Sequence, residues 1–202
     1  MSNPHSTNMQ LKTLEKVGLV EIKQPDYEVE LQIAYATEQN FTGSAVYGAS
    51  GCYLREEASE KLQKAIKLAK LQGMRLRVFD AWRPLEVQQA LWNHTPDPDF
   101  LSPPETGSVP HCRGVAVDLT LIDSNGNDLD MGTGFDEFTI LSHHGNMEVS
   151  AQAQANRYLL MGIMLTAGWD FYSNEWWHYQ LFNCRDYPII SDEKARTGLF
   201  RS

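Results

Sequence analysis

Three short segments of the sequence concentrate side chains that could do chemistry. They read DAWRP at 80–84, HCRGVAVD at 111–118, and EWWH at 175–178. The second and third segments supply His111, Asp118 and His178, and two histidines with one aspartate form a normal ligand set for a catalytic zinc ion. Three protein ligands leave the fourth position of the ion for water. The sequence therefore predicts one zinc ion per chain in an open, catalytic site.

The spacing of the first two candidate ligands requires a break in the backbone. His111 and Asp118 are seven positions apart, so on a straight strand their side chains would point to opposite faces. Gly114 lies between them and accepts backbone angles that other residues resist. A single histidine is more often an ordinary packed or exposed residue than a ligand. The prediction therefore depends on the joint pattern.

Two further residues are candidates for catalysis. Glu175 lies three residues before His178, so a general base is tethered to a ligand, and we expect it at the irregular entrance of a strand. Arg83 could stabilise the negative oxygen that forms when water attacks a carbonyl group, with Asp80 behind it to orient the guanidinium. The alternative for Arg83 is a surface charge that pairs with Asp80.

Other reactive residues are less convincing candidates. Cys112 is a possible soft ligand, but two adjacent residues rarely converge on one ion and His111 already fits. His143 and His144 are adjacent, so their side chains diverge, and we expect both to be helix-entry or loop residues. The tryptophans are expected mainly in the core, with some walling the site.

The elements that must position these residues alternate irregularly. Loose alternation predicts one or two strands over 17–33, and helical spacing predicts a helix over 58–74. A buried strand at 76–79, a helix from Pro84, and strands at 115–121 and 176–179 follow. The segment 151–167 is a predicted helix that Gly168 ends. Between 95 and 110 the proline-rich stretch predicts a long loop of the kind that is often functional.

This order of elements predicts an α+β fold. We expect a single domain over 16–202, preceded by a mobile or loosely packed tail over 1–15. Its central, mostly antiparallel sheet would be flanked by helices and carry the zinc site in a cleft. A chain of 202 residues suits one domain with one core.

Composition excludes several classes of partner. The formal net charge is -9 and there is no cluster of lysine or arginine, which argues against nucleic acid and against anionic membranes. Three widely spaced cysteines do not resemble a disulfide framework. The N-terminus has no basic region followed by an apolar run, and no segment is apolar enough to span a bilayer. We therefore expect a cytoplasmic protein with reduced cysteines.

Taken together, the motifs resemble those of the D-alanyl-D-alanine dipeptidases, the VanX-like zinc peptidases. The wider peptidoglycan-cleaving group shares His-x-x-Gly-x-Ala-x-Asp and a later Glu-x-x-His, which read here as 111–118 and 175–178. Further motifs are specific to the dipeptidase branch of this group. This branch is matched by DAWRP at 80–84, by DMGTGFD at 130–136, and by YAT at 35–37 with Asn40-Phe41. The likeness runs from about residue 17 to about residue 185.

The resemblance implies roles for further residues. It makes His111, Asp118 and His178 the zinc ligands, Glu175 the base and Arg83 the oxyanion stabiliser. Asp136 matches the family residue that receives the free ammonium group of the substrate, and Tyr35 belongs to the N-terminal substrate-binding segment. The family commonly has serine two residues before its first ligand. Here Val109 holds that position, so Ser108 becomes the candidate for contact with the substrate.

The expected function is hydrolysis of D-alanyl-D-alanine, or a closely similar D-dipeptide, by a metal-activated water. One alternative is a D,D-carboxypeptidase or L,D-endopeptidase that acts on longer wall peptides. Another is a non-catalytic binding module that kept the fold and the zinc, which the presence of Glu175 disfavours. A purely structural protein does not explain the joint spacing.

Overall fold

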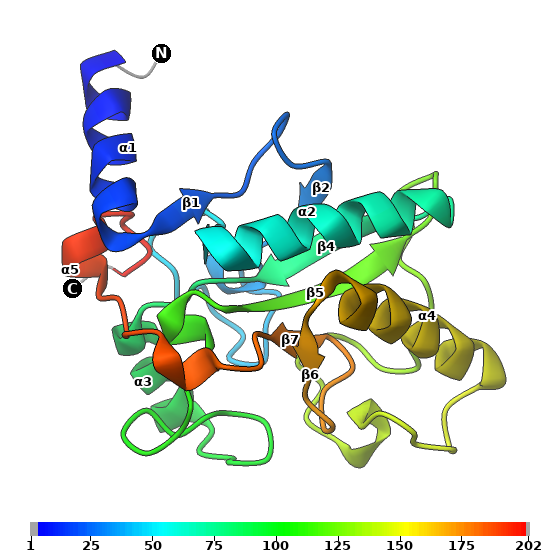
Figure 1. Cartoon of the computed structure of the whole chain (residues 1–202). Helices are drawn as coiled ribbons and strands as arrows, with labels where there is room; N and C mark the ends of the chain where they lie inside the picture. Colours follow the sequence, from blue (N-terminus) through cyan, green and yellow to red (C-terminus); the bar gives the residue numbers. More distant parts are fainter. Residues whose placement is uncertain (1–3, 201–202) are drawn as a thin grey trace.

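The computed structural model describes residues 4–200 and is built around a five-stranded sheet (Figure 1). The strand order is β2-β4-β5-β7-β6. The strands are β2 (Val29–Leu31), β4 (Arg75–Asp80), β5 (Ala116–Ile122), β6 (Asp170–Phe171) and β7 (His178–Gln180). Only β2 and β4 pair in parallel, while the other three pairs are antiparallel. The predicted α+β fold with a mostly antiparallel sheet is confirmed.

The register of the central strands aligns the three reactive segments. Asp80 at the end of β4 is opposite Asp118 on β5, and Asp118 is in turn opposite His178 on β7. All seven residues of β5 are buried, which is expected of a central strand covered on both faces. The sheet therefore gathers residues that are far apart in the sequence at one place.

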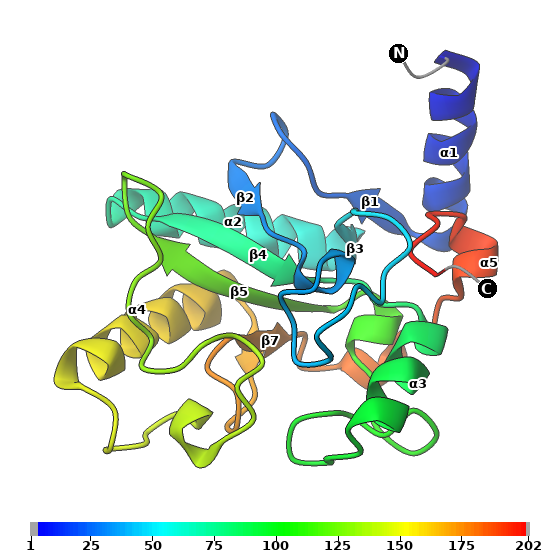
Figure 2. The same ribbon diagram turned by 180° about the vertical axis from the view of Figure 1, so that it is seen from behind.

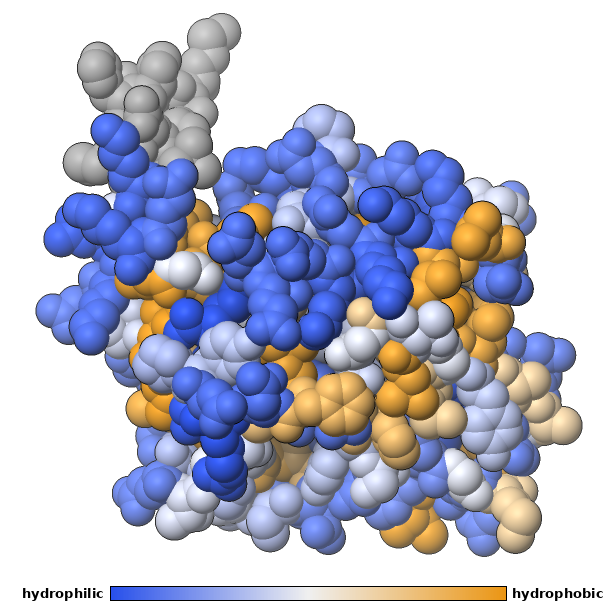
Figure 3. Space-filling model, in the orientation of Figure 1, coloured by the Kyte–Doolittle hydropathy of each residue, from blue (hydrophilic) through white to orange (hydrophobic). Residues whose placement is uncertain are grey.

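Two long helices cover one face of this sheet. Helix α2 (Glu56–Leu71) contacts β4, helix α4 (Ala151–Ala167) contacts β5, and the two helices contact each other. The outward face of α2 is mostly hydrophilic in Figure 3, in keeping with the lysines between its buried apolar residues. Helix α4 ends where Gly168 takes a positive φ of 103°, as the sequence predicts.

Long loops lie on the side of the sheet away from α2. Helix α3 (Leu85–His94) starts directly after Pro84 and leads into the predicted loop at 95–110, which contains no helix or strand. A second long stretch, 129–149, contains only the short 3-10 helix η3 (Ile140–Ser142). Both loops lie below the sheet in Figures 1 and 2.

The N-terminal segment, expected to be a mobile or loosely packed tail over residues 1–15, is helical from Pro4 onward. Residues 1–3 lie outside the described part of the chain, and Pro4–Val17 form helix α1. Leu14 and Val17 are three residues apart and share a face, and both pack against the core. Helix α1 also contacts α5 (Asp192–Ala195) near the other end of the chain. The domain boundary at residue 16 stays a prediction.

The strand predicted at 176–179 is shorter and shifted. Strand β7 begins at His178, because Trp176 and Trp177 belong to a turn in which the His178 amide donates to the Glu175 carbonyl group at 3.4 Å. Two short strands had no clear sequence signal, namely β6 and β3 (Tyr53–Arg55), which pairs with β1 (Leu19–Glu21). Within residues 4–200 no helix has the length and apolar character needed to cross a membrane.

Candidate metal centre and active site

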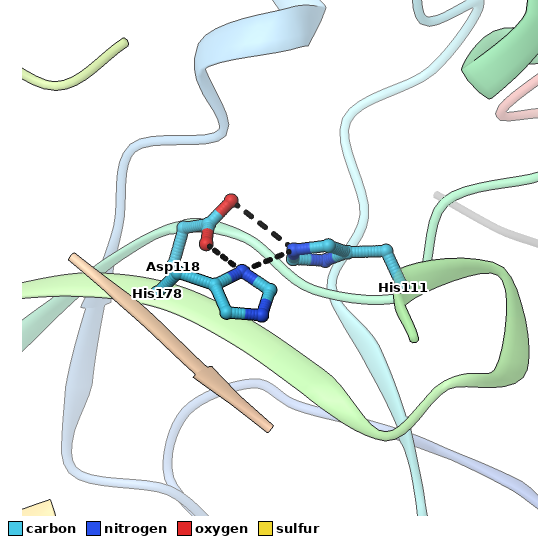
Figure 4. Close-up of side chains that lie close together, drawn as sticks. All are labelled: His111, Asp118 and His178. Carbon is cyan, nitrogen blue, oxygen red and sulfur yellow. Dashed lines mark hydrogen bonds and ion pairs between the residues drawn. The ribbon is translucent and has the colours of Figure 1, made fainter. Parts of the chain in front are cut away.

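The three predicted metal ligands meet in a buried cluster (Figure 4). His111 Nε2 lies 3.1 Å from His178 Nδ1 and 3.4 Å from Asp118 Oδ2. His178 Nδ1 lies 3.1 Å from Asp118 Oδ1. The relative exposure of the three residues is 6%, 3% and 7% for His111, Asp118 and His178. Each residue therefore directs one ligand atom into a shared, dehydrated space.

Local backbone geometry explains how His111 and Asp118 reach the same point. His111 opens the 3-10 helix η2 (His111–Arg113), which Gly114 ends with a positive φ of 72°. A side chain at Gly114 would also place a Cβ 3.0 Å from Leu19 Cδ2. The chain then enters β5, where Asp118 lies. The turn predicted at Gly114 is present and brings the two side chains onto one side.

The tautomers of the two histidines fit a cation between them. His111 Nδ1 donates to the Ala81 carbonyl oxygen at 2.6 Å, so its Nε2 carries a lone pair. His178 Nε2 lies 3.2 Å from Gln180 Oε1 and donates to it, so its Nδ1 also carries a lone pair. Two lone pairs and a carboxylate then converge with no proton between them. Such a donor set fits a divalent metal ion and would be repulsive without one.

The charge state of Asp118 suits this arrangement. Burial alone would raise the pKa of Asp118, but positive charge and hydrogen bonding from His111 and His178 in their protonated forms hold that pKa well below its usual range. A cation bound between the three residues would replace these protons and favour the same ionised carboxylate. Asp118 is therefore ionised at neutral pH. With a cation bound, the centre would combine one negative charge with two neutral imidazoles, which is the charge pattern of an open zinc site with two histidines and a carboxylate.

Glu175 lies beside the candidate metal centre, and its one ion-pair neighbour within residues 4–200 is a histidine of that centre. Its Oε2 is 3.7 Å from His178 Nδ1, and its side chain is buried. Burial raises the pKa of Glu175 well above its usual value, and the nearby carboxylates of Asp118 and Asp136 raise it further. A cation bound at the three ligands would oppose this shift. The carboxyl group therefore has the environment of a proton carrier.

Arg83 is a buried residue held from several sides, and not a surface charge. Its Nε and Nη2 donate to Asp80 Oδ2 at 3.0 and 2.8 Å, and Asp80 also accepts from the Tyr47 hydroxyl at 2.6 Å. The guanidinium lies over the ring of Tyr35, 4.8 Å from its centroid. Its Nη2 is 3.8 Å from Asp118 Oδ2. Arg83 is therefore fixed beside the metal centre, where it could stabilise a developing negative charge.

Asp136 offers an unpaired buried oxygen to the same space. Its Oδ2 has no hydrogen-bond partner among the described residues, and its backbone is held at a positive φ of 58°. Burial raises the pKa of Asp136 well above its usual value, and Asp118 adds to the shift, although Arg83 and a hydrogen bond from Tyr35 oppose it. An aspartate with a strained backbone and one unpaired buried oxygen is typical of a ligand site.

These residues line one cavity of about 270 Å³, just below the roughly 300–1,000 Å³ usual for small-molecule sites. Its walls include Tyr35, Ser108, Trp177, and the segment 98–103 of the long loop. All the predicted site residues line this cavity except Asp80, which contacts Arg83 instead. Val109 also lines the cavity and has a strained φ of 40°, two residues before the first candidate ligand.

Four residues around the site were not expected from the sequence. Tyr47 holds Asp80, Gln180 holds His178, Tyr172 lines the cavity, and Gln88 bonds to Arg83. Gln88 had a signal that could have been noticed, because it interrupts the apolar face of α3 that Val87 and Leu91 share. Gln180 lies two residues after His178 and so shares its strand face.

Comparison with known proteins adds an independent line of evidence. A family model described as D-ala-D-ala dipeptidase matches residues 14–189. The D-alanyl-D-alanine dipeptidase of Escherichia coli (strain K12) is 44% identical over 181 residues, which are 90% of this chain and 92% of the relative. That of Enterococcus faecium is 33% identical, with coverage of 86% and 94%. That of Streptomyces coelicolor is 32% identical, with coverage of 73% and 83%.

Proposed function

This chain belongs to the D-ala-D-ala dipeptidase family of peptidases, and we propose that it hydrolyses D-alanyl-D-alanine to two molecules of D-alanine. The family membership confirms the resemblance seen in the sequence. The observation that carries the proposal is a single small cavity into which a metal-ligand set, a buried carboxyl group, a fixed arginine and an unpaired aspartate all point.

His111, Asp118 and His178 would hold one zinc ion per chain. The two histidine lone pairs and the ionised carboxylate match the ligands that zinc prefers in catalytic sites. A zinc ion bound there would supply a Lewis acid and would lower the pKa of a water molecule toward neutrality. The hydrogen bonds that the imidazoles donate to the Ala81 carbonyl oxygen and to Gln180 Oε1 keep both rings in the required tautomer.

Glu175 and Arg83 would carry the proton and charge changes of hydrolysis. The Glu175 carboxylate takes a proton from the attacking water and then delivers it to the leaving nitrogen. The guanidinium of Arg83, held by Asp80, stabilises the negative carbonyl oxygen as it forms. The burial of Glu175 supports this role, because it raises the affinity of the carboxylate for a proton.

Asp136 would select for a free amino terminus. Its unpaired Oδ2 can accept a hydrogen bond from a substrate ammonium group, and the pairing offsets the cost of burying both charges. Tyr35 and Ser108 line the same cavity and would contact the rest of the dipeptide. The small volume supports a dipeptide over longer wall peptides.

We also propose that the enzyme works in the cytoplasm. All three cysteines, Cys52, Cys112 and Cys184, are buried and free, as predicted, and free thiols are typical of reducing compartments. Burial raises the pKa of Cys112 to about 12, so the reactive thiolate is rare. Fractionation of the native cells, with the protein found in the soluble cytoplasmic fraction, is the test.

Hydrolysis of paired substrates tests the dipeptidase proposal. The zinc-loaded protein should hydrolyse D-alanyl-D-alanine and act at least about a hundredfold more slowly on its N-acetylated form, since acetylation removes the positive charge that Asp136 would bind. The Asp136→Asn variant should lose most of this preference. The exposed Asp186→Asn serves as a matched control and should keep it.

The alternative activities predict different outcomes. A D,D-carboxypeptidase would cleave the acetylated dipeptide and longer peptides as readily as the free dipeptide. A binding module would bind the dipeptide without releasing D-alanine. Either result, obtained with full zinc occupancy, would contradict the proposal.

A further inference from the structure

Gln88 is a buried amide that connects the active-site arginine to the long loop. It lies on α3 and is only 2% exposed, although its neighbours on that face are apolar. Its Oε1 accepts from Arg83 Nη1 at 2.7 Å, and its Nε2 donates to the Ser102 carbonyl oxygen at 2.8 Å. Both ends of the amide are thus occupied, one by the site and one by the cavity wall.

The orientation of this amide follows from chemistry. An arginine can only donate and a backbone carbonyl can only accept, so Gln88 must present its oxygen to Arg83 and its nitrogen to Ser102. A buried amide with both partners in place is held in one rotamer. Together with the two bonds from Asp80, the contact fixes the guanidinium of Arg83 at Nε, Nη1 and Nη2.

On its other side, Gln88 holds a loop that reaches the first metal ligand. The hydroxyl of Ser102 accepts from the Val109 amide at 3.0 Å. Val109 has the strained φ of 40°, and it comes two residues before His111. A chain of contacts therefore runs from Arg83 through Gln88 and Ser102 to the backbone beside His111.

The neutral charge of Gln88 also matters. The site already holds four buried carboxyl groups, namely Asp80, Asp118, Asp136 and Glu175, against the single arginine. A glutamate at position 88 could also accept from Arg83, but it would add a fifth acid and could not donate to Ser102 when ionised. Only a neutral amide satisfies both partners without weakening the positive potential of Arg83.

We infer that Gln88 is a positioning residue that aims Arg83 at the reacting carbonyl group and ties the 95–110 loop to it. Its effect on turnover passes through Arg83, and its effect on the cavity wall passes through Ser102. The first effect rests on the proposed function, whereas the second can be measured without any substrate.

A double-mutant cycle tests the link to Arg83. Gln88→Met keeps the size of the side chain but loses both hydrogen bonds. With the zinc-loaded enzyme, kcat on D-alanyl-D-alanine should fall roughly tenfold or more, because a misplaced catalytic group loses its alignment. In an Arg83→Ala background the same change should lower kcat by less than about twofold, because the arginine that Gln88 positions is absent. The neighbouring exposed Gln89→Met is the matched control and should leave kcat unchanged.

Hydrogen exchange in the absence of substrate tests the link to the loop. The Val109 and Gly107 amides, which bond to Ser102 and Pro103 within the loop, should exchange at least severalfold faster in Gln88→Met than in Gln89→Met. Gln88→Glu should show the same increase, because it also lacks the donor to Ser102. This second variant decides the matter if Gln88→Met does not fold.

The outcomes separate this inference from the proposed function. If the wild type does not hydrolyse the dipeptide, the proposed function fails, and hydrogen exchange still tests the loop contact. If the wild type is active but the kcat losses of Gln88→Met and Arg83→Ala simply add, Gln88 does not act through Arg83. Unchanged exchange in both Gln88 variants would overturn the link to the loop.

Discussion

Four buried carboxyl groups share the active site with one arginine, and each group has a different environment. Asp80 is paired with Arg83, and Asp118 lies between two histidines. Neither Asp136 nor Glu175 has a charged partner this close within residues 4–200, and burial raises the pKa of both. Partnered carboxylates suit permanent charge, whereas unpartnered ones suit binding a cation or a proton. The division of labour among chemically similar residues therefore follows from their contacts.

Replacing Glu175 with glutamine tests whether this carboxyl group is the proton carrier. The substitution keeps size and shape but removes the basic carboxylate, so kcat should fall at least about a hundredfold. Zinc content and KM should change little, because the ligands are intact and proton transfer matters only in the transition state. The exposed Glu148→Gln is the matched control. Near-normal kcat with full zinc would show that another group is the base.

Removing one ligand should release the metal. In His178→Ala two of the three protein ligands remain, and elemental analysis after dialysis should find most of the zinc gone. The exposed His94→Ala should keep a full equivalent of zinc per chain. Full retention in His178→Ala would contradict the ligand assignment.

Among the secondary-structure elements, α4 has a role that goes beyond covering the sheet. Arg157 Nε donates to the Met131 carbonyl group at 2.7 Å, and Asn156 Nδ2 donates to that of Asp130 at 2.8 Å. These carbonyl groups belong to the segment that leads to Asp136. The helix therefore anchors the loop that carries the proposed ammonium-binding residue, and the stability of α4 bears on the site.

The start of α4 offers a test of this stability. Ser150 caps the helix by accepting from the Ala153 amide at 3.0 Å. Ser150→Ala should lower the free energy of unfolding by about 1 kcal/mol, because the amide loses its partner. Ser191 precedes α5 without such a bond, so Ser191→Ala should cost about half as much or less. Urea unfolding of both variants makes the comparison. Equal losses of unfolding free energy in the two variants would show that the hydrogen bond of the Ser150 cap does not stabilise the protein.

For the whole molecule, the stability should depend on pH through a histidine outside the site. Burial lowers the pKa of His144 to about 4, and the positive charge of Arg157 adds to the shift. Neither ring nitrogen has a hydrogen-bond partner within the described residues, and the ring packs against Phe171. The folded chain therefore keeps His144 neutral at pH values at which the unfolded chain protonates it.

The free energy of unfolding should fall as the pH drops from about 6.5 to about 4, the interval between the unfolded and folded pKa values of His144. The contribution of this residue is at most roughly 3 kcal/mol, and less to the extent that water reaches the ring. Urea unfolding at several pH values should show a shallower pH dependence in His144→Asn than in the wild type. Identical pH dependence would exclude His144 as the source.

The sequence alone was enough to identify the family of this protein and to predict its site residues. The ligand types, the tethered Glu175 and the dipeptidase-specific motifs are local patterns, so they can be read without a structure. Helices such as the one at 151–167 were also predictable, because apolar periodicity and a terminal glycine are local signals. The need for a turn near Gly114 was also predictable, because residues seven positions apart on a straight strand point to opposite faces.

Only the tertiary structure decided how these parts meet. The register that places Asp80, Asp118 and His178 side by side depends on pairing between strands distant in sequence. The short strands β3 and β6 form because they can pair with β1 and β7. Helix α1 is stabilised because Leu14 is buried in the core. Gln88 and Tyr47 matter only through contacts with residues that folding brings near. Local patterns specify which groups are present, whereas long-range packing specifies which groups touch.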